Sequence, residues 1–230
     1  MSKFKITVTT KSNLFIGGNP TMFEIGGVDQ YTIVDTDQRP YIPASTLKGV
    51  FRQCLKEVEK TEKQERIVNQ YKQILTNIKD ANENRINSGV NIEKDRKDKL
   101  PDTLSRAIQL ADITYLFGIS GFNRTPKLIF NDLKCITEDS NALFSIDTKN
   151  TILIDEQDIH ANPRTYKTVR PGVIFQGEIL LYKLEESGFN LEDIEDCLNC
   201  VRDACNCGLC RIGGSGSRGY GRVFVEIERG

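Results

Sequence analysis

A glycine-rich stretch near the C-terminus, Gly213 to Arg222, is the part of the sequence best suited to bind an anion. It holds five glycines. Their bare backbone N–H groups can approach a ligand closely, and phosphates suit such loops best. Arg218 and Arg222 add positive charge, and Tyr220 adds a ring on which a base can stack. The composition leaves two interpretations open, a loop for an anionic ligand and a surface hairpin.

The charges of the chain are segregated, although the net charge is only −1. Three stretches carry basic residues and no acid: residues 40–56, 159–177 and 206–225. Such stretches can converge on one groove that follows a phosphate backbone, which favours a nucleic acid as partner. Scattered solvated charge is the alternative, because a single charge run is usually a solvated face.

Acid–base chemistry has few candidates in this chain. Asp29 follows the glycine pair Gly26-Gly27, and an aspartate after glycine most often bonds its own backbone in a turn. Asp35 and Asp37 lie in a short polar stretch typical of turns, and we expect both to be turn residues. His160 is the only histidine, and an exposed ligand contact is favoured for it over a role as general base.

Seven cysteines without an export signal indicate a cytoplasmic, reducing setting rather than a disulfide framework. Cys197, Cys200, Cys207 and Cys210 have the paired spacing of a Cys₄ site, which gives a structural zinc as one interpretation. In the other, Cys197 and Cys205 lie on the apolar stripe of a helix and act as small hydrophobic residues. No apolar segment approaches the length of a membrane span, so no membrane partner is expected.

The elements that must position these residues follow from periodicity. Alternating apolar and polar residues predict strands at residues 4–10, 31–34, 127–136, 173–184 and from 223 onward. Helical spacing predicts one helix with an N-cap at Ser45 or Thr46 and another within residues 57–81. A third is predicted from about Asp102 to Phe117, and a fourth after a cap at Asn190. Without the inserted helices the order is β-α-β-β-α-β. We therefore expect an α+β fold of the ferredoxin-like or RRM-like type with a long β-hairpin.

Six segments, spread over nearly the whole chain, form a recognisable pattern. They are Leu14 to Gly18, Gly26 to Asp29, Tyr41 to Arg52, Leu116 to Gly118, Ala161 to Arg164, and Gly213 to Val223. In this order they resemble the RAMP superfamily, and more narrowly the backbone subunit of type III CRISPR effector complexes. Phe15 stands where the family often has a histidine, and Ala44 stands where the family's serine helix usually opens with glycine.

The resemblance implies a single domain over residues 1–230. Its core would comprise about 1–56, 111–136 and 173–230, with a helical lid inserted at about 57–110 and a thumb-like hairpin at about 137–172. Copies of the protein would stack in a filament on a CRISPR guide RNA, with the thumb between its bases. Further implied partners are the paired target RNA, a large polymerase/cyclase-type subunit, a small subunit and end-capping RAMP subunits.

The resemblance also implies that target RNA is cut once per subunit in a reaction dependent on Mg²⁺ or Mn²⁺, and it places catalysis at Asp29. The implied RNA-binding residues are Gly17, Gly18, Ser45, Thr46, Lys48, Arg52, Asn162, Arg164, Gly213, Gly214, Ser215, Ser217, Arg218 and Tyr220. Two other functions remain open: a non-catalytic RNA-binding scaffold of the same complex, and a guide-processing endoribonuclease. The latter enzymes typically rely on a histidine near the N-terminus.

Overall fold

The computed structural model describes residues 2–18, 28–87, 94–154 and 159–230, and it places side chains outside residues 85–100 and 151–162. Residue contacts divide the chain into two compact units. The first comprises Leu55–Ile129 and Leu181–Cys200, and the second comprises Ser2–Cys54, Phe130–Leu180 and Val201–Gly230. Each has its own buried apolar residues.

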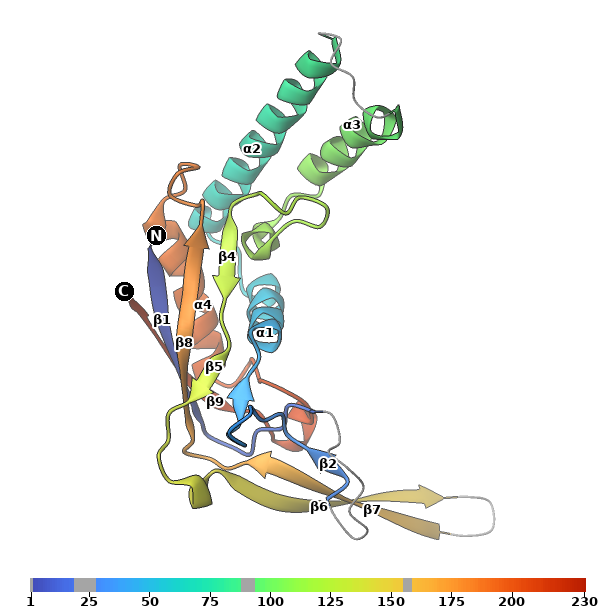
Figure 1. Cartoon of the computed structure of the whole chain (residues 1–230), viewed down its shortest axis with the longest axis vertical. Helices are drawn as coiled ribbons and strands as arrows, with labels where there is room; N and C mark the ends of the chain where they lie inside the picture. Colours follow the sequence, from blue (N-terminus) through green and yellow to red (C-terminus); the bar gives the residue numbers. More distant parts are fainter. Residues whose placement is uncertain (1, 19–27, 88–93, 155–158) are drawn as a thin grey trace. The chain divides into compact units, whose positions relative to one another are not determined.

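The second unit is built on an antiparallel sheet (Figure 1). Its strands, in spatial order, are β3 (Tyr41–Ile42), β5 (Leu133–Cys135), β8 (Ile174–Tyr182), β1 (Lys3–Thr10) and β9 (Val223–Arg229), and β4 (Lys127–Phe130) pairs with β8. With α1 (Ala44–Glu57) after β3 and α4 (Leu191–Asn206) before β9, the core reads β1-α1-β5-β8-α4-β9. The predicted ferredoxin-like arrangement is confirmed.

The central strand β1 shows why this sheet forms. Its side chains alternate, so that Phe4, Ile6 and Val8 are buried while Lys3 and Lys5 are exposed. This period of two is what a strand with one covered face requires. Ile6 lies between Gly177 of β8 and Ile227 of β9 in the two registers.

Helix α1 buries Leu47 and Phe51, and the Phe51 ring meets that of Phe130 edge-on at 5.6 Å. The helix begins at Ala44, whose N–H donates to the Asp132 carboxylate at 2.7 Å. The predicted cap at Ser45 or Thr46 is therefore wrong. Asp132, which follows β4, supplies the oxygen that a capping side chain would otherwise offer, so both hydroxyl residues lie inside the first turn.

The first unit contains α2 (Glu62–Asn87) and α3 (Lys94–Gln109), which lie side by side in Figure 1. Its core surrounds Tyr71, whose ring lies 4.8 Å from that of Phe189 and whose hydroxyl donates to the carbonyl of Pro126. The helix predicted from Asp102 to Phe117 is corrected. α3 ends at Gln109, and the Asp112 carboxylate caps a separate 3₁₀ helix, Ile113–Phe117, by accepting from the Thr114 N–H.

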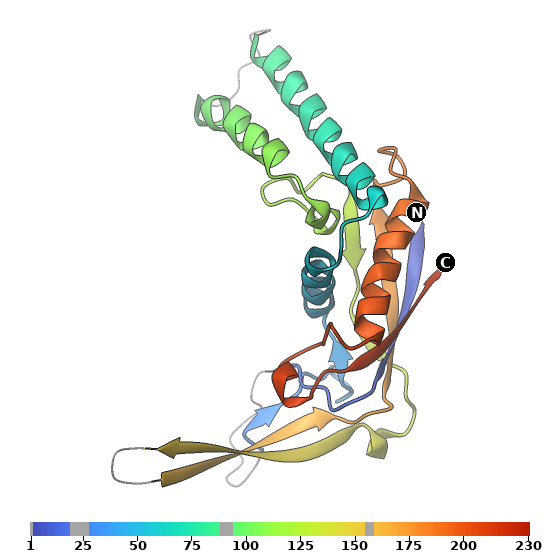
Figure 2. The same ribbon diagram turned by 180° about the vertical axis from the view of Figure 1, so that it is seen from behind.

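A long hairpin of β6 (Phe144–Ile154) and β7 (Ile159–Val169) extends from the second unit (Figure 2). Its antiparallel pairs run from Phe144 opposite Val169 to Ile154 opposite Ile159. The short strand β2 (Gln30–Tyr31) adds to β7 in parallel. The hairpin falls within residues 137–172, the range given to the thumb, while the division into core, lid and thumb stays a prediction.

Helix α4 begins where the sequence predicted. The Asn190 side chain accepts a hydrogen bond from the Glu192 N–H at 2.9 Å, so the expected cap is confirmed. Among the described helices, none is long and apolar enough to cross a bilayer.

Candidate functional site

Asp29 lies immediately before β2, beside the hairpin strand β7. Its carboxylate accepts hydrogen bonds from both the backbone N–H (2.6 Å) and the hydroxyl (3.0 Å) of Thr165. In return, the Asp29 N–H donates to the Thr165 hydroxyl oxygen at 3.1 Å. Among the described residues, Asp29 therefore bonds a neighbouring strand, through Thr165. The preceding Gly26 and Gly27 lie outside the described residues.

The same contacts keep Asp29 ionised. The pKa of its carboxyl group lies below the ordinary 3.8, first because of the Thr165 N–H, then because of the Thr165 hydroxyl, with a smaller effect from the Arg164 charge. The side chain is exposed, so the ion stays hydrated. Asp29 is thus a carboxylate near neutral pH, suited to hold a cation or accept a hydrogen bond, and unsuited to act as a general acid.

Replacing Thr165 by Val is expected to raise the pKa of Asp29 toward the ordinary value, because only the backbone N–H bond remains. In the wild type the lowered pKa means that the Asp29 ion stabilises the fold above about pH 4, a contribution that is lost as the pH falls through the lowered pKa. An NMR pH titration of the Asp29 side-chain carbonyl measures the change. Thr148→Val, on the paired strand, is the control. If the pKa of Asp29 is unchanged in Thr165→Val, the Thr165 hydroxyl does not lower it.

Two glycines seat the glycine-rich loop against the segment after β1. Gly213 and Gly221 have positive φ angles of 82° and 74°. A Cβ at Gly213 would lie 2.3 Å from the carbonyl oxygen of Phe15, and one at Gly221 would lie 2.1 Å from that of Ile212. No other residue fits at either position. The next N–H, of Gly214, donates to the same Phe15 oxygen at 2.7 Å.

The middle of the loop stays open to ligands. A single 3₁₀ turn, Gly216–Arg218, follows Ser215, which adopts a left-handed conformation with φ of 61°. Ser217 and Arg218 are exposed. The loop is therefore fixed at its ends and presents hydroxyl and guanidinium groups between them, which favours the ligand-loop interpretation over a loose surface hairpin.

Lys149 of β6 joins the loop to the hairpin. Its Nζ lies 3.7 Å from the ring centroid of Tyr220 and 4.4 Å from that of Tyr166, and it donates to the Ser215 hydroxyl at 3.1 Å. The Tyr220 hydroxyl donates to the carboxylate of Asp147. This polar and aromatic cluster orients Tyr220 by its hydroxyl and covers its ring with a cation.

Electrostatics in this cluster favour an incoming anion. Partial burial lowers the pKa of Lys149, and the nearby Arg218 charge lowers it further. Burial and the Asp147 bond raise the pKa of Tyr220 to about 12, so its hydroxyl stays protonated. Lys149 and Arg218 repel each other across the loop. A phosphate placed near both would relieve this repulsion.

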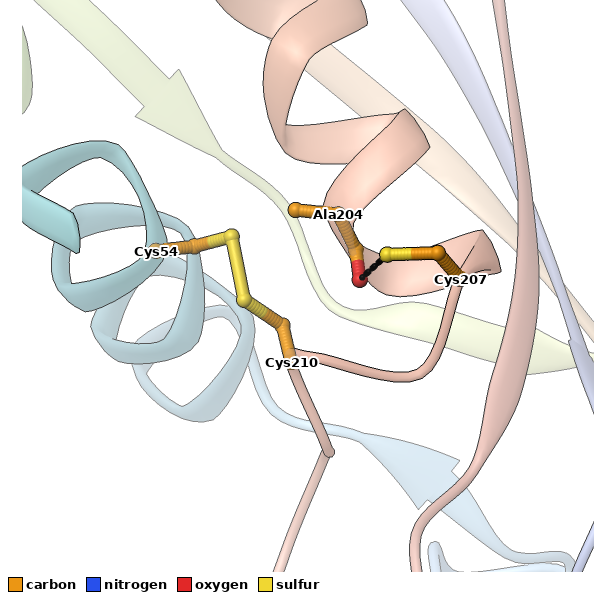
Figure 3. The surroundings of a disulfide bond; sticks show 4 residues. All are labelled: Cys54, Ala204, Cys207 and Cys210. Atoms are coloured by element: carbon orange, nitrogen blue, oxygen red, sulfur yellow. Dashed lines mark hydrogen bonds between the residues drawn. A yellow bond between two sulfur atoms is a disulfide. The ribbon is translucent and has the colours of Figure 1, made fainter. Parts of the chain in front are cut away.

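A disulfide between Cys54 and Cys210 ties α1 to the segment that leads into the loop (Figure 3). Both side chains are buried, and their Cα atoms are 6.2 Å apart. The expectation that no cysteines are paired is wrong for these two, since the fold brings them together across 156 positions of sequence. The other five cysteines, all within the described ranges, form no disulfide.

The zinc prediction is corrected by the same geometry. Cys210 is bonded to Cys54, and the exposed Cys207 Sγ contacts the carbonyl of Ala204 at 3.2 Å (Figure 3). Burial raises the pKa of the Cys197 thiol to about 12, which disfavours the thiolate that zinc needs. Within the described ranges, no three His, Cys, Asp or Glu side chains gather as a metal site. A continuous helix through Cys197 and Cys200 separates the two pairs.

The predicted site residues fall into three groups within the second unit. The first group belongs to the segments that are joined through Phe15 and the Lys149 cluster. Its members are Gly17, Gly18, Gly213, Gly214, Ser215, Ser217, Arg218 and Tyr220. Ser45, Thr46, Lys48 and Arg52 lie on α1, which the disulfide ties to the loop. Arg164 lies on β7 near Asp29, whose pKa its charge lowers, and the backbone of Asn162 lies on the same strand further toward the hairpin tip. The side chains of Asn162 and His160 lie outside the described ones.

Sequence reasoning missed Lys149, Tyr166 and Thr165. Lys149 reaches Tyr166 only because of the hairpin register, in which Thr148 lies opposite Thr165 and Asp147 lies opposite Tyr166. Thr165 contacts Asp29 instead. The alternation of residues 144–150 could have indicated a strand, but nothing in the sequence sets which residue faces which across a long hairpin.

Comparisons with known proteins cover the whole of this architecture. The family model of the RAMP superfamily matches residues 7–224. The "CRISPR system Cms endoribonuclease Csm3" of Streptococcus thermophilus is 30% identical over 234 aligned residues, which cover 97% of this chain and 86% of that protein.

A solved structure extends the comparison to three dimensions. It is a chain of the type III-B Cmr-beta complex bound to cognate target RNA, determined by cryo-EM, with a TM-score of 0.52 and 18% identity. The match covers 99% of this chain and spans 60% of that one. At this identity the likeness establishes a shared fold.

Proposed function

Because this chain belongs to the RAMP superfamily, we propose that it is a backbone subunit of a type III CRISPR ribonucleoprotein, which binds guide RNA and cleaves the paired target RNA. The relative that matches along nearly the whole chain is named an endoribonuclease. The observation that carries the proposal is Asp29, an exposed, ionised carboxylate anchored to β7, one strand of the long hairpin.

Guide RNA binds along the second unit in this proposal. Lys48, Arg52 and Arg218 contact phosphates, and Arg164 accompanies the hairpin. Backbone and hydroxyl groups of the glycine-rich loop complete the contacts; they come from Gly213, Gly214, Ser215 and Ser217, together with Gly17 and Gly18. Ser45 and Thr46 add hydroxyls from the first turn of α1. Tyr220 supports the loop through Asp147 and Lys149, and Asn162 lies toward the hairpin tip.

Cleavage takes place at Asp29 and depends on Mg²⁺ or Mn²⁺. Asp29 offers a carboxylate there, and the described side chains form no cluster of three ligands. One carboxylate does not form a protein-only cage, but it fits Mg²⁺, which proteins often hold by one or two carboxylates together with substrate phosphates. When bound, the cation supplies charge that stabilises the displaced oxygen. Asp29 positions it, or orients the attacking 2′-hydroxyl, while Thr165 fixes the carboxylate.

The proposal extends to assembly. Copies of the subunit line up along one guide, together with a large polymerase/cyclase-type subunit, a small subunit and end-capping RAMP subunits. The test is to assemble the protein with guide RNA and its partner subunits and to add labelled target RNA with Mg²⁺. Evenly spaced cuts that EDTA abolishes support the proposal. Target that is bound and never cut leaves the scaffold function, and cleavage of precursor repeat RNA by the isolated protein favours the guide-processing one.

The double change Lys48→Ala/Arg218→Ala is expected to weaken guide binding about tenfold and to reduce the slope of log affinity against log salt by about 1.4, as two lost phosphate contacts predict for single strands. Fluorescence anisotropy across a salt series measures both quantities. The matched control is Lys134→Ala/Arg229→Ala, which removes two exposed cations outside the site. Equal salt slopes for the two double variants contradict the phosphate contacts.

A further inference from the structure

The first unit contains a cavity of about 430 Å³ that the proposed function does not use. One face of α2 forms its floor, through Gln64, Glu65, Val68, Asn69 and Lys72. The rest is supplied by Leu55 and Lys56 at the end of α1, by Lys60 before α2, and by Ala111, Asp112 and Ile113. We call it the Gln64 pocket. Its volume lies in the range of small-molecule sites.

Gln64 is the unusual residue of this pocket. Its side chain is 2% exposed, yet neither the amide nitrogen nor the amide oxygen has a hydrogen-bond partner among the described residues. The backbone is satisfied, because the Gln64 N–H donates to the Thr61 hydroxyl. Buried amides are nearly always paired. Because Gln64 lines the cavity, a turn of its side chain would present this unpaired donor and acceptor to a ligand with the matching pair.

Three lysines surround the same cavity. Other cations of α2 are already paired, since Lys63 bonds Asp196 and Arg66 bonds Asp193. None of the ion pairs among the described residues uses Lys56, Lys60 or Lys72. Of the two acids in the lining, Asp112 is engaged by Thr114, and the exposed Glu65 stands against the three lysines. The pocket thus combines a neutral donor–acceptor pair with an excess of positive charge.

We propose that the Gln64 pocket binds a single unpaired nucleotide. The base edge pairs with the Gln64 amide, in the way a glutamine amide pairs with the adjacent donor and acceptor of adenine. The phosphate lies among Lys56, Lys60 and Lys72, and Leu55, Val68 and Ile113 contact the base. The same chemistry is offered by a free mononucleotide and by one unstacked nucleotide of single-stranded RNA. None of the residues proposed for guide binding lines the pocket, so this site is independent of that function.

The test is isothermal titration of the full-length protein with AMP, with inorganic phosphate, and with a short oligo(A) RNA. AMP is expected to bind, and phosphate alone is expected to bind at least tenfold more weakly. Gln64→Leu removes both amide atoms at similar volume and is expected to lower AMP affinity at least tenfold. Its melting temperature stays equal or rises, because an unpaired buried amide is lost. The control is Gln73→Leu, an exposed position of α2 bonded to Asn77.

The two sources are separated by the two adenine probes. AMP binding that Gln64→Leu weakens assigns a free mononucleotide. Oligo(A) binding that Gln64→Leu weakens, without measurable AMP binding, assigns a nucleotide held within RNA. The proposal is overturned if neither probe responds to Gln64→Leu in a folded protein, or if phosphate alone binds as tightly as AMP. Lys60→Gln should weaken AMP binding about threefold to tenfold and reduce its salt dependence.

Discussion

Replacing Asp29 by Asn is expected to lower target-RNA cleavage by about 100-fold or more, while guide and target binding stay within about twofold of wild type. A carboxylate that positions a catalytic cation contributes several kcal/mol to the transition state, and each 1.36 kcal/mol is about tenfold in rate. The amide oxygen of the substituted side chain can still accept from the Thr165 N–H and hydroxyl, so the attachment to β7 is kept and only the charge is lost.

Single-turnover cleavage by the assembled complex measures this effect. The control is Asp37→Asn, which removes a charge from an exposed turn close in sequence. Asp29→Cys adds a test of the cation, because a thiolate ligand favours softer metals: Cd²⁺ should then restore more activity than Mg²⁺. If Asp29→Asn retains cleavage within about threefold, Asp29 is not the catalytic group.

Breaking the Cys54–Cys210 bond is expected to lower the free energy of unfolding by about 2–5 kcal/mol. The bond closes a loop across 156 positions, and long loops restrict the unfolded chain most. Urea unfolding of the wild type with and without dithiothreitol measures the difference, and the Cys54→Ala/Cys210→Ala variant should match the reduced protein. Cys207→Ser, at an exposed position outside the disulfide, should change the free energy by no more than about 0.5 kcal/mol.

The disulfide also joins two parts of the proposed guide-binding surface. It links α1, which carries Lys48 and Arg52, to the segment before Gly213. The unfolding midpoint of the wild type in dithiothreitol is compared with that of Cys207→Ser. If it is no lower, the bond adds nothing to stability under those conditions.

The core was predictable because its signals are local. The alternation at Phe4, Ile6 and Val8 and the cap at Asn190 each determine an element by themselves, and their order then fixes the ferredoxin-like arrangement. The long helix around Tyr71 was found in the same way, from apolar residues at helical spacing.

Predictions failed where a distant residue decides the outcome. Asp132 replaces the expected cap of α1, and Cys54 removes Cys210 from the expected zinc site. The partner of Asp29 was hidden for the same reason, since Thr165 reaches it through the parallel pairing of β2 with β7. Short-range patterns carry no information about such long-range pairs. The Gln64 pocket was invisible too, because an unpaired amide is recognised only when its surroundings are known.

The bonds between Asp29 and Thr165 make the carboxylate part of the hairpin strand in a mechanical sense. With the parallel pairs of Gln30 with Tyr166 and Tyr31 with Lys167, any shift of β7 carries Asp29 along. If the protein cuts target RNA at Asp29, as we propose, a hairpin that is not seated between the bases would leave the carboxylate away from the scissile phosphate. The accuracy of the cut would then follow from geometry, because the strand that enters the RNA would also hold the catalytic group.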